Sequence, residues 1–581
     1  MTTAAVIETP KTPAWAWAAT LALLVLGLGM AADAALRSSA TYDEVTYLRV
    51  AAEWWRTGRQ DEITRMGSPS LFWKWQQAPV LFALDRAGFG AMVDRPLDHQ
   101  PALLPLVRLW SLAFYATALA TTAGWARRVY GPRAMVAASA MFALSPNLIG
   151  HGALATMEMP LVALTAGLGW LSWEWLSRGS RRAFVGSAAL AGLAFSCKYT
   201  AILYPALIGA CWVVERWRAG DRPRRSLLAR SVGLVASYAA IMAASNLAAT
   251  AFDLAPISLN ASHHPSLDAK LSGPLKTLAA HAITTPIPRE LAGFVSQARL
   301  QGEGGTSYLL GMRRGYGWWY YYLVTLAVKV PLGAGLILAA RAATIRVRSP
   351  HTPGSALIPT FVIGFLTITS IASTRNYGIR YLLPLAPMAI VWGSGLAAGP
   401  RRSRLLLGVG LVGMGLAVGS IHPHELAYFN EAAGGPRGGR FLLGDSNLDW
   451  GQGCKDLAAL QADRPELADL TLYYFGDTDP SRFGVRGRTY LVNAVTLPPG
   501  FPARLSADTR YVAVSTSLQH GPWGPPGYFG ALDDAPPVAA LPDWSIVVYR
   551  SADIGRPRTL PVPLMPRYDV DLTPASGPSP P

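Results

Sequence analysis

The chain has 581 residues, of which 51% are hydrophobic and only 15% are charged, and its mean hydropathy is +0.25. This composition excludes an ordinary soluble protein and predicts a polytopic membrane protein, because the apolar residues lie in long runs. The formal net charge of +16 would suggest a nucleic-acid partner in a soluble protein. Here the arginines gather in short segments between apolar runs, as membrane-orientation signals do, so no nucleic-acid partner is expected.

Eleven apolar runs come close to the ~20 residues that a hydrocarbon core ~30 Å thick requires. We predict membrane spans at about residues 14–32, 103–125, 133–149, 155–177, 183–198, 200–215, 231–252, 318–340, 355–373, 381–398 and 405–420. The first run is kept as a span because no cleavage site followed by a soluble domain is recognisable. The fifth and sixth runs are short enough to form one broken pair.

The arginines predict the orientation of these spans. One alternate set of loops holds nearly all of them, and this set is cytoplasmic by the positive-inside rule. The opposite, outer side then holds two long loops at about 33–102 and 253–317, together with everything after about residue 421. Lys198, Arg375 and Arg380 are exceptions, because they lie on the outer side and orientation does not explain them.

The polar C-terminal part has a different periodicity. The segments LTLYYFG, TYLVNAV, RYVAVST and WSIVVYR are rich in β-branched and aromatic residues and predict short strands, preceded by a helix near 450–462. We therefore predict a transmembrane domain over 1–420, an extracytoplasmic α/β domain over 421–555, and a proline-rich, disordered tail over 556–581.

Acidic residues also lie on the outer side. Asp43 and Glu44 follow the first span within an amphipathic stretch, and Glu158 stands at the outer start of the fourth span. Adjacent acids cannot share one helix face, so Asp43 and Glu44 should have different roles. The alternative is that both are simply a charge pair favoured in the first turn of a helix.

The combination of acids and bases on one side indicates a substrate site. Ionisable groups at a membrane edge usually pair with one another or line a substrate path. Asp43, Glu158, Lys198 and Arg380 converging at the outer leaflet would suit a phosphate head attached to a hydrophobic tail. Arginine binds phosphate oxygens in a bidentate manner and lysine adds a point charge, so a polyprenyl-phosphate sugar is the predicted substrate.

A series of segments then resembles a family. TYDEVTYLRVAAEW, ATMEMP, GLAFSCKYT, YLLGMRRGYGWWYYYLVTLAVKVPLG, GIRYLLPLAPMAIV, HPHELAYFNEAAGGP and GDSNLDWGQ are similar, in this order, to the GT-C glycosyltransferases of the protein-mannosyltransferase and aminoarabinose-transferase type, also called glycosyltransferase family 39-like. The resemblance covers roughly residues 40–455 and implies a GT-C fold. It also implies that Asp43, with Glu44 beside it, is the catalytic base or orients the acceptor. Many relatives have aspartate where this chain has Glu158.

The expected reaction is transfer of a sugar from a polyprenyl-phosphate donor to a lipid, glycan or protein acceptor on the outer face of the cytoplasmic membrane. Such a transferase needs one base for the acceptor hydroxyl and cations for the departing phosphate, and in-line attack would invert the anomeric centre. Further candidates for substrate contacts follow from the same motifs: Tyr381 after Arg380, Arg375 nearer the rim, and Asp445, Asn447 and Asp449 in DSNLDWGQ. The alternative for DSNLDWGQ is a capped turn that opens a helix.

Two other possibilities stay open at this point. A transporter or flippase of lipid-linked sugars would also explain the spans, but it predicts ionisable residues near mid-bilayer and broken helices in matching halves. A non-catalytic relative would have lost the base. No cofactor is expected, although a divalent metal stays open, because His422 with His424 and His263 with His264 have no third ligand nearby.

Overall fold

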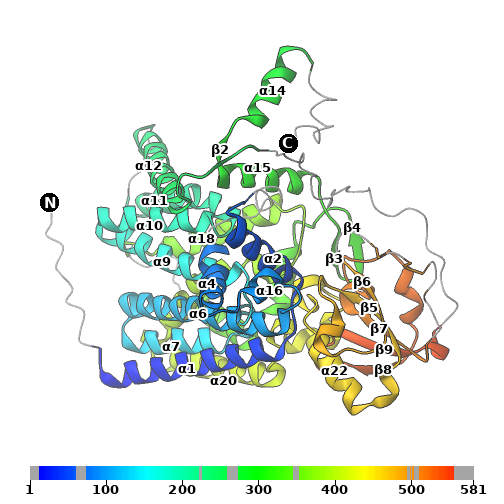
Figure 1. Cartoon of the computed structure of the whole chain (residues 1–581). Helices are drawn as coiled ribbons and strands as arrows, with labels where there is room; N and C mark the ends of the chain where they lie inside the picture. Colours follow the sequence, from blue (N-terminus) through cyan, green and yellow to red (C-terminus); the bar gives the residue numbers. More distant parts are fainter. Residues whose placement is uncertain are drawn as a thin grey trace.

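The computed structural model describes residues 12–60, 73–220, 225–257, 272–344, 352–493, 497–498, 500–502, 505 and 509–554. Figure 1 shows a large bundle of helices with a smaller part beside it that contains a sheet. The predicted tail at 556–581 lies outside the described residues, as do parts of the two long loops predicted on the outer side.

Every predicted apolar run contains helix. The bundle consists of α1 (Ala14–Arg37), α6 (Gln100–Tyr130), α7 (Pro132–Ala143), α8 (Pro146–Gly152), α9 (Glu158–Arg178), α10 (Arg181–Phe195), α11 (Tyr204–Arg218), α12 (Arg225–Ala249), α16 (Tyr321–Lys329), α17 (Leu332–Ala343), α18 (Leu357–Ala372), α19 (Ala386–Ser394) and α20 (Arg401–Ile421). Among the described residues, four helices are long and apolar enough to cross a membrane, and two bent pairs would raise this number to six. The chain is therefore an integral membrane protein, while the predicted count of eleven spans stays a prediction.

The two bent pairs have a local cause in the sequence. The chain turns by 64° between α7 and α8 and by 110° between α16 and α17. Ser145 precedes Pro146 and Val330 precedes Pro331, and both preceding residues have extended backbone. A proline disfavours the helical conformation in the residue before it, so each apolar run is interrupted there.

The smaller part is a five-stranded sheet with the order β6-β5-β7-β9-β8. β5 pairs in parallel with β6 and β7, whereas β9 pairs antiparallel with β7 and β8. The four predicted strands are present, and β8 is an additional one. The elements are α22 (Cys454–Asp463), β5 (Leu470–Phe475), β6 (Arg488–Val492), β7 (Tyr511–Ser515), β8 (Pro537–Ala540) and β9 (Ile546–Arg550).

The sheet has two apolar faces, because alternate residues of a strand point to opposite sides. Leu472 and Tyr474 of β5 join one cluster with Leu457 of α22. Tyr473 and Phe475 join another cluster, whose members also include Leu154, Leu426 and Trp450. This second face therefore packs the sheet against the helical bundle.

Several shorter elements lie along the chain between helices of the bundle. They are α2 (Tyr42–Thr57), a π-helical turn (Trp73–Gln77), α4 (Ala78–Arg86), α5 (Gly90–Asp94), β1 (Leu254–Ala255), α14 (Pro274–Thr284), β2 (Ile287–Pro288), α15 (Arg289–Gly302), β3 (Ser307–Leu309) and β4 (Met312–Arg314). In Figure 1, α14 projects from the bundle, whereas α2 lies within it.

Candidate active site

Two ion pairs lie at the centre of the candidate site. Nη1 of Arg380 donates to Oδ2 of Asp43 at 2.7 Å, and Nζ of Lys198 lies 3.2 Å from Oε1 of Glu158. The four residues come from the first turn of α2, the start of α9, the connection after α10, and a short 3-10 turn at Ile379–Tyr381. The structure therefore brings together the two acids and two bases whose convergence the sequence predicts.

Tyr381 links the two pairs. Its ring centroid lies 4.2 Å from Nζ of Lys198 and 5.5 Å from Cζ of Arg380. A cation over an aromatic face is attracted by the quadrupole of the ring, so Tyr381 stabilises both charges without occupying their N–H groups. Tyr47 adds a long hydrogen bond of 3.4 Å to Oδ2 of Asp43. The cluster is thus one connected set of charged and aromatic groups.

Not every N–H group of Arg380 has a hydrogen-bond acceptor in the described part of the chain. Its side chain is 11% exposed, and among the described residues its Nε has no hydrogen-bond partner. A buried donor without a partner carries a desolvation penalty of about 1–3 kcal/mol, and more when it is charged. The guanidinium therefore has one N–H edge that is open in the sense that no acceptor among the described residues occupies its Nε–H, although this atom is covered by protein.

Glu44 lies in a different network from its neighbour Asp43. It is fully buried, and its two oxygens accept from Nε and Nη2 of Arg108 at 2.8 and 2.6 Å. It also accepts the backbone N–H of Ala155 at 2.8 Å and forms the capping box of α2 with Thr41. Burial alone would raise the pKa of Glu44, but Arg108 and the backbone donors bring this pKa below the usual value.

Arg108 completes this second network. Besides Glu44 it donates to the backbone oxygens of Ala35, Ser38 and Ser39 at 2.8–2.9 Å. The end of α1, the start of α2 and the residues before Glu158 are therefore held by one buried ion pair. The structure does not bring Glu44 to the Arg380 cluster, so its predicted catalytic role has no geometric support here. The reason is that side chains at successive helical positions point about 100° apart.

The DSNLDWGQ residues predicted as substrate contacts have separate environments. Asp445 accepts from the indole N–H of Trp523 at 2.7 Å; burial raises its pKa, and the charge of Arg380 works against this rise. Asn447 accepts the backbone N–H of Ile379 at 3.1 Å. Asp449 accepts the backbone N–H of Ser517 at 2.9 Å, and burial raises its pKa to about 7. Asp445 is thus close to the cluster, whereas Asp449 faces the sheet.

Arg375 is also removed from the two ion pairs. Its Nε donates to the backbone oxygen of Gly304 at 2.7 Å, which ties it to the end of the α15 region. Its predicted place nearer the rim and its role toward substrate stay predictions.

Sequence reasoning missed two aromatic neighbours of the cluster. Trp450 is 1% exposed, and its ring centroid lies 4.4 Å from Cζ of Arg380. The ring of His151 lies 6.3 Å from that of Trp450, and Nδ1 of this histidine has no hydrogen-bond partner among the described residues. Trp450 could have been predicted, because it stands within the DSNLDWGQ motif. His151 lies seven residues before Glu158, and only the fold shows that it lies near the cluster.

An apolar cavity of about 310 Å³ lies beside the charged cluster. Pro160 lies two residues after Glu158, and Cys197 immediately precedes Lys198, so the cavity wall and the ion pair share two chain segments. The lining residues come from the π-helical turn, α6, α9, α10 and the residues just after α10: Trp75, Phe114, Thr117, Thr121, Pro160, Ala163, Leu164, Gly167, Leu190, Leu193 and Cys197. These walls suit a hydrocarbon rather than a sugar.

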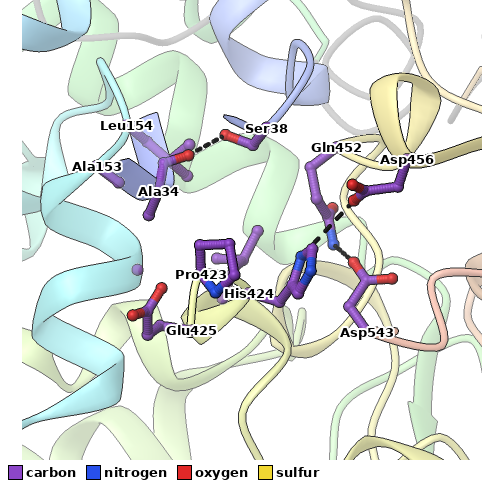
Figure 2. Close-up of a pocket in the computed structure, with 12 residues that line it drawn as sticks. Ala34, Ser38, Ala153, Leu154, Pro423, His424, Glu425, Gln452, Asp456 and Asp543 are labelled. Atoms are coloured by element: carbon purple, nitrogen blue, oxygen red, sulfur yellow. Dashed lines mark hydrogen bonds and ion pairs between the residues drawn. The ribbon is translucent and has the colours of Figure 1, made fainter. Parts of the chain in front are cut away.

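Figure 2 shows a second, polar pocket where the bundle meets the sheet. Its volume is about 20 Å³, which is room for roughly one water. His424 lies 3.6 Å from Asp456, and Gln452 donates to Asp543 at 3.0 Å. This pocket is too small for a sugar, so it is not the candidate site.

The described part of the chain contains no group of three or more His, Cys, Asp or Glu side chains placed to hold a metal ion.

Part of the chain matches a known protein family. Residues 105–247, which include Glu158 and Lys198, match the family model of the dolichyl-phosphate-mannose-protein mannosyltransferases. The predicted resemblance to the protein-mannosyltransferase type is confirmed over that segment. A search of curated proteins finds no match.

Solved structures give distant similarities. ArnT from Cupriavidus metallidurans in the apo state is 15% identical, with a TM-score of 0.46, and the alignment covers 93% of this chain and 99% of that one. The same protein bound to undecaprenyl phosphate also has a TM-score of 0.46. The oligosaccharyltransferase from Archaeoglobus fulgidus in the apo form is 12% identical, with a TM-score of 0.40, covering 86% of this chain and 70% of that one.

Proposed function

We propose that the protein is a membrane glycosyltransferase that moves a sugar from a polyprenyl-phosphate donor to an acceptor hydroxyl, with inversion. The observation that carries this proposal is the Asp43–Arg380 pair with its open N–H edge, lying beside the Glu158–Lys198 pair and an apolar cavity. The family match over residues 105–247 supports it.

The cations suit the phosphate of such a donor. Arg380 offers a free Nε edge, and Lys198 has two further N–H groups beyond the one that meets Glu158. A planar guanidinium matches phosphate geometry, and charge-assisted hydrogen bonds are about twice as strong as neutral ones. Both cations already have carboxylate partners, so a bound phosphate shares each cation with its carboxylate.

The apolar cavity suits the first part of the polyprenyl tail. Its lining residues Pro160 and Cys197 lie within two positions of Glu158 and Lys198 in the chain, so the tail of a donor whose phosphate binds at these residues would lie close to it. Each buried CH₂ group contributes about 0.8 kcal/mol. The charged cluster would thus bind the phosphate of the donor, and the apolar cavity would bind its tail.

Asp43 is the residue that we propose as the base. It is 23% exposed on its side chain and shares one oxygen with Arg380. In the reaction Asp43 takes the proton of the acceptor hydroxyl, and the hydroxyl oxygen forms a bond to the anomeric carbon. The bond from this carbon to the phosphate oxygen breaks, and its electron pair goes to the phosphate, which Arg380 and Lys198 stabilise.

The location and acceptor belong to the same proposal. The arginine distribution supports an active site on the outer face of the cytoplasmic membrane, with residues after about 421 also outside. The acceptor is a lipid, a glycan or a protein, and membrane lipids surround the bundle. A mass-spectrometric comparison of envelope glycans and glycoproteins with and without the gene would identify which acceptor is modified.

Substitution of Arg380 tests the phosphate site. Arg380→Lys keeps the charge but loses the bidentate edge, so affinity for a polyprenyl phosphate, titrated into the purified protein, should fall roughly tenfold or more. The matched control is Arg341→Lys, because Arg341 also lies against a tyrosine and a tryptophan ring but at the end of α17. Unchanged affinity in Arg380→Lys, or absence of binding in the wild type, would contradict the proposed phosphate site.

A further inference from the structure

Trp450 contacts the charged cluster without forming part of the chemistry. Its ring lies 4.4 Å from the guanidinium carbon of Arg380, and it is one of the largest fully buried side chains. The contact is made through the ring and not through the indole N–H, so it takes no hydrogen-bond donor from Arg380. This distinguishes Trp450 from Asp43, which occupies Nη1.

The chain around Trp450 also fixes the two segments that carry Asp43 and Arg380. The backbone N–H of Tyr42, one residue before Asp43, donates to the backbone oxygen of Trp450 at 2.8 Å. The side chain of Asn447 accepts the backbone N–H of Ile379, one residue before Arg380, at 3.1 Å. Residues 445–452 thus form hydrogen bonds to Tyr42 and Ile379, the residues that immediately precede Asp43 and Arg380.

Residues 445–452 are themselves fixed by hydrogen bonds to the bundle, to the sheet and within the stretch. From the bundle, Nζ of Lys329 donates to the backbone oxygen of Asn447 at 2.6 Å. From the sheet, Ser517 donates its backbone N–H to Asp449 at 2.9 Å. Within the stretch, the amide of Gln452 accepts the N–H of Trp450 at 2.8 Å and donates to the oxygen of Leu448 at 2.7 Å. The indole therefore has little freedom to move away from Arg380.

The indole ring close to the guanidinium carbon of Arg380 has a specific consequence. An arginine side chain carries large rotamer entropy, and one hydrogen bond to Asp43 leaves rotation about that bond open. A cation–π contact adds a second restraint on the guanidinium and uses none of its N–H groups as donors to an acceptor atom. The open Nε edge of Arg380 is then kept in one direction before any ligand arrives.

We propose that Trp450 is a positioning residue that holds the guanidinium of Arg380 against its ring, so that the Nε edge stays directed toward the phosphate of the donor. This inference rests on the proposed function, because the phosphate is the ligand of that edge. Trp450 acts through Arg380 and does not touch the reacting atoms.

The test is a double-mutant cycle on the affinity of the purified full-length protein for a polyprenyl phosphate in lipid nanodiscs. Trp450→Leu should weaken binding roughly three- to thirty-fold, the range of a desolvated cation–π contact. Trp450→Phe keeps an aromatic face and should retain most of the affinity. In the Arg380→Lys background, Trp450→Leu should have little further effect, because the edge that it positions is already gone.

A matched control separates positioning from packing. Trp544 also has arginines on its ring, with Cζ of Arg440 at 4.7 Å and Cζ of Arg437 at 5.5 Å, and among the described residues it makes no ring contact with Arg380 or Lys198. Trp544→Leu should therefore leave the affinity unchanged. Equal losses from Trp450→Leu in both backgrounds, or unchanged affinity in the wild-type background, would overturn the role of Trp450 alone. Absence of binding by the wild type would reject the proposed function and this role with it.

Discussion

Asp43 and Glu44 are neighbours in the sequence, and each pairs with an arginine, yet the two pairs differ in almost every physical respect. The Glu44–Arg108 pair is 0–1% exposed, with two short bonds between the partners and three backbone carbonyls on Arg108. The Asp43–Arg380 pair is 11–23% exposed, has one bond and leaves Nε of Arg380 without a partner among the described residues. A saturated pair stabilises a fold, whereas an unsaturated one can accept a ligand.

The largest effect is expected from Asp43→Asn. This substitution preserves size and removes the proton acceptor, so the rate of sugar transfer should fall by about 10²–10⁴-fold while the melting temperature changes little. The rate is measured with purified protein, a polyprenyl-phosphate sugar and the identified acceptor. Near-normal turnover in Asp43→Asn together with an inactive but stably folded Glu44→Gln would transfer the catalytic role to Glu44.

The opposite behaviour is expected from Glu44→Gln. It leaves Arg108 buried with no charged partner, and breaking a buried pair costs about 3–5 kcal/mol of unfolding free energy. Thermal melting in detergent should show a much lower melting temperature than in the wild type or in Asp43→Asn. A melting temperature equal to that of the wild type would remove the distinction between the two pairs.

The smallest effect is a difference in acid sensitivity. The pKa of Glu44 is lowered in the folded state, so the stability that its ionised form contributes is present above about pH 4.5, the ordinary value, and is lost as the pH falls through the folded pKa. Below pH 4.5 the wild type should therefore lose stability more steeply than Glu44→Gln, which has no proton to take up there. Parallel melting curves from pH 6 to pH 3 would contradict this assignment.

The sequence allowed the candidate cluster to be predicted better than the buried pair. Lys198 and Arg380 were recognisable because the predicted orientation puts them on the side that is poor in basic residues, and the ordered motifs added Asp43 and Glu158. Arg108 gave no such signal. It stands inside an apolar run, and its partner lies 64 residues away, so only the packing of α6 against α2 makes the pair visible.

Hydropathy also explains what could be predicted of the fold. Apolar runs located the helices, and β-branched and aromatic residues located four strands, because both signals are local. A window average does not register a single proline, so the runs at 133–149 and 318–340 were predicted as whole spans although Pro146 and Pro331 divide them. Since these bends follow from proline, they need no transport mechanism to explain them.

The hydrogen bonds that join residues 39–42 to residues 450–454 have a consequence for biogenesis. Ser39 accepts the backbone N–H of Cys454, 415 positions later, and Tyr42 donates to Trp450. A ribosome synthesises the segment of Asp43 early, but the partners that fix this segment emerge only after every helix of the bundle has been made. The candidate site is therefore completed last, and a nascent or prematurely terminated chain contains Asp43 without the residues that fix its segment.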